Sequence, residues 1–244
     1  KLAFPSANVS DRLEKTFTSV NFNMMIMVIY ALITIAIFGM WYYARYEGNF
    51  LPSPKKTFNP MMIVAIVILV PGTQFAANFI ANLTGYIRPD WLQQYNELFE
   101  TSGITDTTFV TVLYSVILAP ICEELIFRGV TMRCARKALP FALANLMQAA
   151  LFGLFHLNWI QGIYAFALGI VLGYVCERGG SIYYSMGLHL LFNLWGTLSG
   201  FFPDPGNSVV VFVVVIVVTI VSLVVGFVLF NKGRRKLPIN STGI

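Results

Sequence analysis

Residues 209–230 read VVVFVVVIVVTIVSLVVGFVLF, an apolar run without a single charged side chain. A helix needs about 20 such residues to cross the hydrocarbon core of a bilayer. The many β-branched residues would also suit a buried strand, but the run is much longer than such strands are. We therefore interpret it as a transmembrane helix that faces lipid, and we predict an integral membrane protein.

The composition of the whole chain agrees with this interpretation. Of the 244 residues, 57% are hydrophobic and only 11% are charged, whereas an ordinary soluble domain is about 25% charged. The net charge of +5 comes from short basic clusters beside apolar runs, which is typical of loops that face the cytoplasm. Composition therefore excludes a soluble domain, and the charge indicates topology rather than binding of nucleic acid.

Apolar runs of about the length of a span recur along the chain. They predict an all-α, polytopic transmembrane helix bundle of about seven spans, with an eighth if the full-length protein has an upstream helix. Because no repeat or linker divides the chain, we expect a single membrane domain over residues 1–244. The polar segment 84–106 has apolar residues at near-helical spacing and predicts an amphipathic helix at the interface. The predicted spans are about 24–44, 61–83, 107–127, 140–157, 159–176, 181–199 and 208–230.

Arginine and lysine residues determine the predicted orientation. Basic clusters follow the first, third, fifth and last spans, so all of them lie on one side. The positive-inside rule places this side, and with it the C-terminus, in the cytoplasm. Short basic loops make a bacterial inner membrane the default location. The N-terminal tail, with Lys1, Arg12 and Lys15, would then lie outside, a conflict that an upstream helix removes. The clusters are Arg45, Lys55 and Lys56; Arg128, Arg133, Arg136 and Lys137; Arg178; and Lys232, Arg234, Arg235 and Lys236.

Three ionisable residues lie in the otherwise apolar stretch CEELIFRGV at 122–130. Charges in the hydrocarbon region are costly and by default indicate function, unless they have reached the solvated interface. Glu124 and Arg128 are four residues apart and can pair on a helix, whereas Glu123 points about 100° away. We therefore expect one neutralised carboxylate and one free carboxylate, which is suited to a general base.

The other candidate side chains are the two histidines of the chain, both in predicted spans, and the asparagine of the sixth span. FGLFH places Phe152 and His156 one turn apart, and HLLFN does the same for His189 and Asn193. Counting 1.5 Å per residue from the cytoplasmic ends puts His156 about 24 Å deep, well below His189 and Glu123. For these groups to meet, the fourth helix would have to begin well outside the hydrocarbon.

These motifs carry a family resemblance. EELIFR, FGLFH and HLLFN resemble, in order, the EExxxR, FxxxH and HxxxN motifs of the CPBP (Abi-like) intramembrane proteases, which include type II CAAX prenyl endopeptidases and bacteriocin-processing enzymes. The resemblance covers the expected protease core at about 107–199. It implies that Glu123 and His156 activate a water, that Glu124 and Arg128 pair and hold the site, and that His189 and Asn193 stabilise the oxyanion.

The resemblance and the residues together predict an intramembrane endopeptidase that hydrolyses a membrane-associated or lipidated peptide or protein. The alternative is a non-catalytic binding or bacteriocin-immunity protein of the same fold. We expect no cofactor, because HExxH is absent and the two glutamates diverge. Zinc held by Glu123, His156 and His189 remains the alternative. Cys122 and Ser185 are interpreted as packing residues, and Gly169 and Gly173 as a close helix contact.

Overall fold

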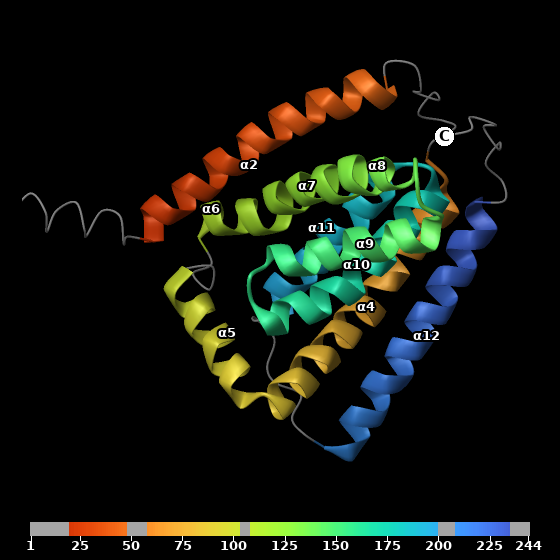
Figure 1. Cartoon of the computed structure of the whole chain (residues 1–244). Helices are drawn as coiled ribbons and strands as arrows, with labels where there is room; N and C mark the ends of the chain where they lie inside the picture. The colour runs from red at the N-terminus through yellow and green to blue at the C-terminus, as the bar shows by residue number, and fades with distance from the viewer. Residues whose placement is uncertain (1–19, 48–57, 103–107, 200–207, 235–244) are drawn as a thin grey trace, which may run out of the picture.

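The structure, a computed structural model, describes residues 20–47, 58–102, 108–199 and 208–234, and within these ranges it contains helices and no strands (Figure 1). Several helices join end to end into a single long rod between residues 109 and 135. The elements are α2 (Val20–Tyr42) with its π-helical end η1 (Tyr43–Glu47); α4 (Pro60–Ile87); α5 (Pro89–Ser102); the rod of α6 (Phe109–Val112), η2 (Leu113–Leu118), α7 (Ala119–Glu124), η3 (Leu125–Met132) and α8 (Arg133–Ala135); α9 (Phe141–Phe155); α10 (Trp159–Gly179); α11 (Ile182–Ser199); and α12 (Val209–Arg234).

The predicted helical membrane bundle is confirmed. Five of the described helices are long and apolar enough to cross a bilayer, namely Phe22–Arg45, Pro60–Ile87, Phe109–Ala135, Trp159–Gly179 and Val209–Arg234. Helices stand at the two other predicted spans as well, but α9 has only 15 residues and α11 is 18 residues long and less apolar. The sequence therefore predicted seven membrane-spanning helices, and five of them are long and apolar enough to cross a bilayer.

Helix α4 lies against α10, α11 and α12 and forms much of the core. It contains Pro71, which cannot donate a backbone hydrogen bond. Beside it, the hydroxyl of Ser222 on α12 accepts from the Gly72 N–H at 2.9 Å and donates to the Ile68 carbonyl. Because this hydroxyl is inserted between two backbone groups that would otherwise pair, it locks α12 onto α4 at the proline.

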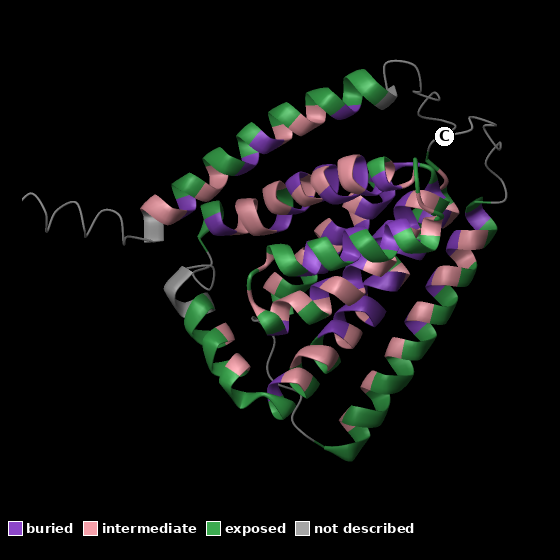
Figure 2. Ribbon diagram, in the orientation of Figure 1, coloured by how far each residue is buried: buried purple, intermediate pink, exposed green. Residues whose placement is uncertain are grey.

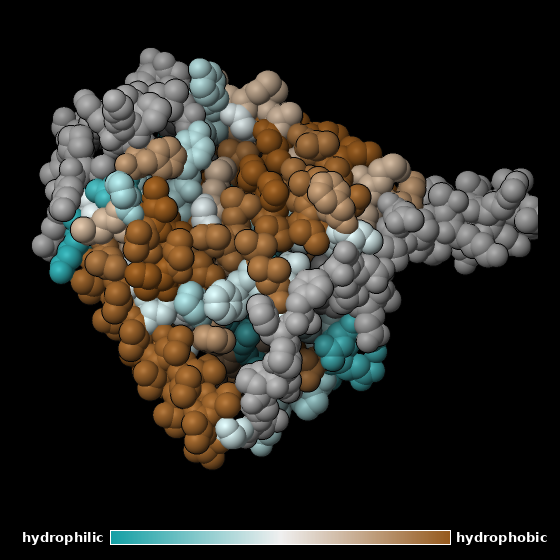
Figure 3. Space-filling model, turned by 180° about the vertical axis from the view of Figure 1, so that it is seen from behind, coloured by the Kyte–Doolittle hydropathy of each residue, from teal (hydrophilic) through white to brown (hydrophobic). Residues whose placement is uncertain are grey.

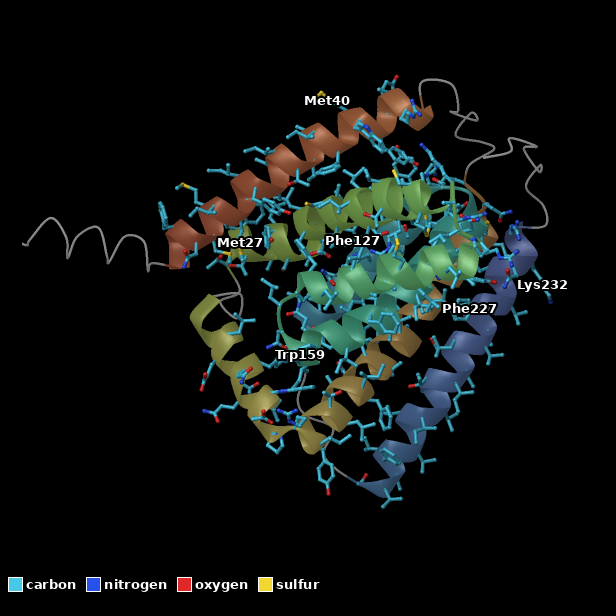
Figure 4. All side chains as sticks on the ribbon, viewed as in Figure 1. Met27, Met40, Phe127, Trp159, Phe227 and Lys232 are labelled. Atoms are coloured by element: carbon cyan, nitrogen blue, oxygen red, sulfur yellow. The ribbon has the colours of Figure 1, made fainter. Side chains whose placement is uncertain are left out.

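Buried residues concentrate where α7, α9, α10 and α11 meet, and the outward faces of α2 and α12 are exposed (Figure 2). These exposed faces are apolar; Met40 on α2, for example, is 66% exposed and points away from the bundle (Figure 4). From behind, hydrophobic residues cover most of the described surface, and hydrophilic residues form a band across its middle and lie at its edges (Figure 3). An apolar outer surface, with the buried polar and charged side chains directed into the bundle, is the arrangement expected for a protein surrounded by lipid.

The basic helix ends gather at one end of the bundle (Figure 1). Arg133 on α8 donates to the Tyr42 hydroxyl on α2 at 3.1 Å, and Arg136 pairs with Glu177 on α10 at 3.2 Å. Asn59, the N-cap of α4, donates to the Gly233 carbonyl near the end of α12. The described members of the basic clusters therefore share that side, except Arg128, which the sequence placed in a loop but which lies buried inside the rod. Lys55, Lys56, Arg235, Lys236 and the N-terminal tail lie outside the described residues.

The amphipathic helix predicted between the second and third spans is present at the opposite end, as α5. It begins at Pro89 rather than at residue 84, because α4 continues to Ile87. The Trp91 ring of α5 stacks on Trp159, the first residue of α10, with centroids 5.3 Å apart. This contact fixes α5 against the turn that joins α9 to α10.

The third predicted span needs a correction, because its helix ends at Ala135 and not at residue 127. Arg133 and Arg136 led us to expect a loop, but both side chains are held by hydrogen bonds to neighbouring helices. The rod also contains two π-helical stretches, η2 and η3, on either side of Glu123 and Glu124. π-helical turns are rare in proteins, and those that occur often lie at functional sites. The two stretches therefore indicate a functional role for the glutamates independently of the motif.

Candidate functional site

The ion pair predicted within the third helix is present and fully buried. Arg128 Nη1 donates to Glu124 Oε1 at 2.9 Å, and both side chains have 0% exposure. The alternative that these charges lie in the solvated interface is therefore excluded. A second guanidinium nitrogen, Arg128 Nη2, donates to the Gly169 carbonyl of α10 at 3.3 Å. The pair thus links the rod to a neighbouring helix.

His189 connects the two glutamates. Its Nδ1 lies 3.0 Å from Glu124 Oε1, and its Nε2 lies 3.6 Å from Glu123 Oε2. Because Glu124 Oε1 already accepts from Arg128, the proton in the shorter contact belongs to His189 Nδ1. The two adjacent carboxylates differ in environment: Glu124 is fully buried between two donors, whereas Glu123 is 15% exposed. The histidine beside Glu123 is therefore His189, where the family resemblance implied His156.

Phe152 lies at the centre of the site. Its ring centroid is 5.0 Å from that of His156 and 5.7 Å from that of His189, and the Arg128 Cζ lies 4.5 Å above it. The sequence identified Phe152 only as part of a motif. Its spacing of one turn from His156 was visible there, but its contact with Arg128 and His189 depends on helices distant in the chain.

Both histidines therefore lie against Phe152 without any displacement of the fourth helix out of the hydrocarbon. With the third helix predicted to end at residue 127, Glu123 was expected too near the surface. In the structure the helix from Glu123 to Ala135 spans roughly 18 Å, and α9 from Phe141 to Phe152 spans roughly 17 Å. Glu123 and Phe152 thus lie at similar distances from the basic end.

His156 caps the C-terminus of α9 and has one nitrogen engaged. Its Nδ1 lies 2.9 Å from the Phe152 carbonyl, which can only accept, so this nitrogen carries the proton. In the neutral ring Nε2 is then an acceptor. The following residue, Leu157, has φ of 52° and turns the chain into α10, whose N-cap is Asn158. The nitrogen that remains open is the one suited to take a proton.

Asn193 lies one turn beyond His189 on α11, as predicted. Its amide donates to the Ser115 carbonyl in η2 at 2.8 Å. An amide has two N–H groups, so this bond orients Asn193 while one N–H remains for another acceptor. Ser115 was not identified from the sequence, because a backbone carbonyl leaves no mark in the residue types.

Other candidates are accounted for by packing. Ser185 is buried and donates to the Ile182 carbonyl, and Cys122 is a buried free cysteine. Across the described ranges, no group of three or more His, Cys, Asp or Glu side chains gathers in a way that could hold a metal ion. Glu123, His156 and His189 therefore do not fit a three-ligand zinc site as they stand.

A polytopic helical bundle with two inequivalent carboxylates, two histidines and an arginine in its interior defines a membrane protein equipped for acid–base chemistry. The Rce1-like family, described as type II CAAX prenyl endopeptidase, matches residues 105–195. The matched region contains every motif residue named above, which supports the resemblance seen in the sequence, and the family description implies protease activity at the level of the family. No curated protein and no solved structure matches the chain.

Proposed function

We propose that this protein is an intramembrane endopeptidase in which Glu123 activates the attacking water. The observation that carries the proposal is the difference between two adjacent carboxylates. Glu124 accepts from Arg128 and His189 and is fully buried, so its charge is committed to the structure. Within the described part of the chain, Glu123 has the longer contact of 3.6 Å with His189, and it is partly exposed. It is the carboxylate available to take a proton.

Each remaining site residue has a role in hydrolysis. Glu123 removes a proton from water, whose oxygen attacks the carbonyl carbon of the scissile peptide bond. His156 Nε2, unprotonated, accepts a hydrogen bond from the same water. The tetrahedral oxyanion receives hydrogen bonds from the second N–H of Asn193 and from His189. When the C–N bond breaks, Glu123 returns the proton to the leaving amine.

The charges of the site are consistent with His189 as a donor. Its Nδ1–H is engaged by Glu124, so donation from Nε2 requires a protonated ring. With His189 protonated, Glu123, Glu124, His189 and Arg128 sum to zero net charge. A neutral set is what a low-dielectric interior favours, since an unbalanced charge there is costly.

We assign the substrate to membrane-associated or lipidated peptides, since the site lies within a helical membrane bundle of the Rce1-like family. We also place the basic end of the bundle, with the C-terminus, in the cytoplasm, because four basic clusters belong to it. Cleavage then occurs from the cytoplasmic side, and a bacterial inner membrane remains the expected location.

A direct assay tests the proposal. The purified chain in liposomes is incubated with a farnesylated peptide that ends in a CAAX sequence, and the products are identified by mass spectrometry. We expect cleavage of the farnesylated peptide and much slower cleavage of the same peptide without the lipid. Tight binding of the peptide without any cleavage would contradict the proposal and favour the non-catalytic alternative.

The same assay tests whether the attacking water is activated without a metal ion. Our proposal predicts that incubation with a strong chelator leaves the rate of cleavage unchanged. Loss of cleavage on chelation, with recovery on addition of zinc, would contradict it and would make Glu123, His156 and His189 metal ligands after movement of the side chains.

A further inference from the structure

A pair of buried amides lies between α9 and α10. Gln148 and Asn145 lie one turn apart on α9; Gln148 has 0% exposure and Asn145 has 5%. Burying an amide costs free energy unless its polar atoms find partners. Neither residue belongs to the three motifs, and the partners of their amide groups indicate what they do.

The orientation of both amides follows from backbone carbonyls, which can only accept. Gln148 Nε2 donates to the Gly169 carbonyl at 2.9 Å and to Asn145 Oδ1 at 2.7 Å. Asn145 Nδ2 donates to the Ile170 carbonyl at 3.0 Å. Both hydrogens on Gln148 Nε2 are therefore used, and two successive carbonyls of α10 are held by α9.

The Gly169 carbonyl is shared with the site. It accepts from Gln148 Nε2 at 2.9 Å and from Arg128 Nη2 at 3.3 Å. Arg128 Nη1 in turn donates to Glu124 Oε1, which also accepts from His189 Nδ1 at 3.0 Å. A continuous series of hydrogen bonds thus leads from Gln148 on α9, through α10 and the rod, to the histidine beside Glu123.

We propose that Gln148 is a positioning residue: it fixes the Gly169 carbonyl that orients Arg128, and through Arg128 it sets the position of Glu124 and His189. Glycines at 169 and 173 make this possible, because a side chain at Gly173 would overlap the Asn145 and Gln148 amides. The role in catalysis rests on the proposed function, whereas the link to His189 can be measured without any substrate.

The first experiment reads the imidazole of His189 directly. The chain contains two histidines, so ¹⁵N labelling of histidine in a protein without a histidine tag gives the signals of two rings, and His156→Gln identifies those of His189. Gln148→Met has a similar length and no amide. We expect it to shift the Nδ1 signal of His189, because the hydrogen bond to Glu124 changes. Unchanged His189 signals in a folded Gln148→Met protein would overturn the proposal.

The second experiment separates kcat from KM for cleavage of the farnesylated peptide. Since Gln148 acts through other residues and is not placed in contact with the substrate, Gln148→Met should lower kcat by about ten- to a hundredfold and leave KM unchanged. The matched control is Gln74→Met, since Gln74 is a buried glutamine on α4 whose amide donates to Asn78. We expect the control to retain kcat and the His189 signals.

The outcomes distinguish the two proposals. If the wild-type chain cleaves no peptide but Gln148→Met shifts the His189 signals, the proposed function fails and the positioning role stands. If cleavage is observed and Gln148→Met keeps the wild-type kcat, or if Gln74→Met lowers kcat equally, the positioning role fails and the proposed function stands. Should Gln148→Met not fold, Gln148→Glu replaces it. Because its carboxylate competes with Glu124 for Arg128, we expect lower kcat and shifted His189 signals; wild-type values for both would overturn the proposal.

Discussion

Glu124 and Arg128 form an ion pair with Oε1 and Nη1 2.9 Å apart, and neither side chain is exposed. The carboxylate is also bound by His189, and the guanidinium by the Gly169 carbonyl. The pair therefore joins the rod, α10 and α11 at one point. Glu124 is held by its two partners, and we expect its loss to affect stability. Its neighbour Glu123 is not held in this way, and we expect its loss to affect the reaction.

Arg128→Ala should destabilise the protein strongly. Removing the guanidinium leaves a buried carboxylate without its cation, a change that costs about 3–5 kcal/mol in proteins. Thermal melting in detergent measures the effect. The control is Arg88→Ala, because Arg88 pairs with Asp90 in an exposed ion pair; we expect it to melt as the wild type does. An Arg128→Ala variant as stable as the control would contradict the structural role of the pair.

Gly173→Ala should disrupt the contact between α9 and α10. A Cβ at this position would overlap the Asn145 side chain, and the helices would have to separate. We expect a loss of stability of about 1–3 kcal/mol, as for other overpacked interiors. A Cβ at Gly187 meets nothing within 4 Å, so Gly187→Ala is the control and should be neutral or slightly stabilising. Equal melting temperatures for the two variants would argue against a tight contact.

Local spacing in the sequence predicted the part of the site that lies on single helices. Glu124 with Arg128, Phe152 with His156, and His189 with Asn193 are each four residues apart, and helical geometry alone places their members on one face. The close contact at Gly169 and Gly173 was predicted on the same basis and is confirmed, since both positions lie against α9. Even the inequivalence of the two glutamates followed from their angular separation.

The contacts between helices could not be predicted in this way. His189 contacts the glutamates although it lies 65 residues from Glu124 in the chain. Arg128 donates to the backbone carbonyl of Gly169, an acceptor that residue types do not reveal. The end of the third helix was misplaced for a related reason. Arg133 and Arg136 resemble loop residues by composition, and only their long-range partners Tyr42 and Glu177 explain why the helix extends to Ala135. As a result, the predicted position of Glu123 was too near the surface.

Leu157→Gly should stabilise the turn that follows His156. Leu157 has φ of 52° and is 95% exposed, so its side chain gains little from packing while its backbone lies in the left-handed region. Glycine adopts this conformation freely, and we expect a gain of up to about 1 kcal/mol. The control is Leu154→Gly, an exposed helical position of α9, which should lose about 1 kcal/mol. A loss at Leu157 as large as at Leu154 would show that the turn is not strained.

We propose that Glu123 is the base and that Glu124 is the structural carboxylate. Glu123→Gln keeps the size and hydrogen bonding of the side chain but removes its ability to take a proton. The most direct measurement is therefore the rate of peptide cleavage by purified Glu123→Gln, taken together with its melting temperature. We predict a melting temperature close to that of the wild type and loss of nearly all cleavage; a folded Glu123→Gln protein that cleaves at the wild-type rate would contradict the account.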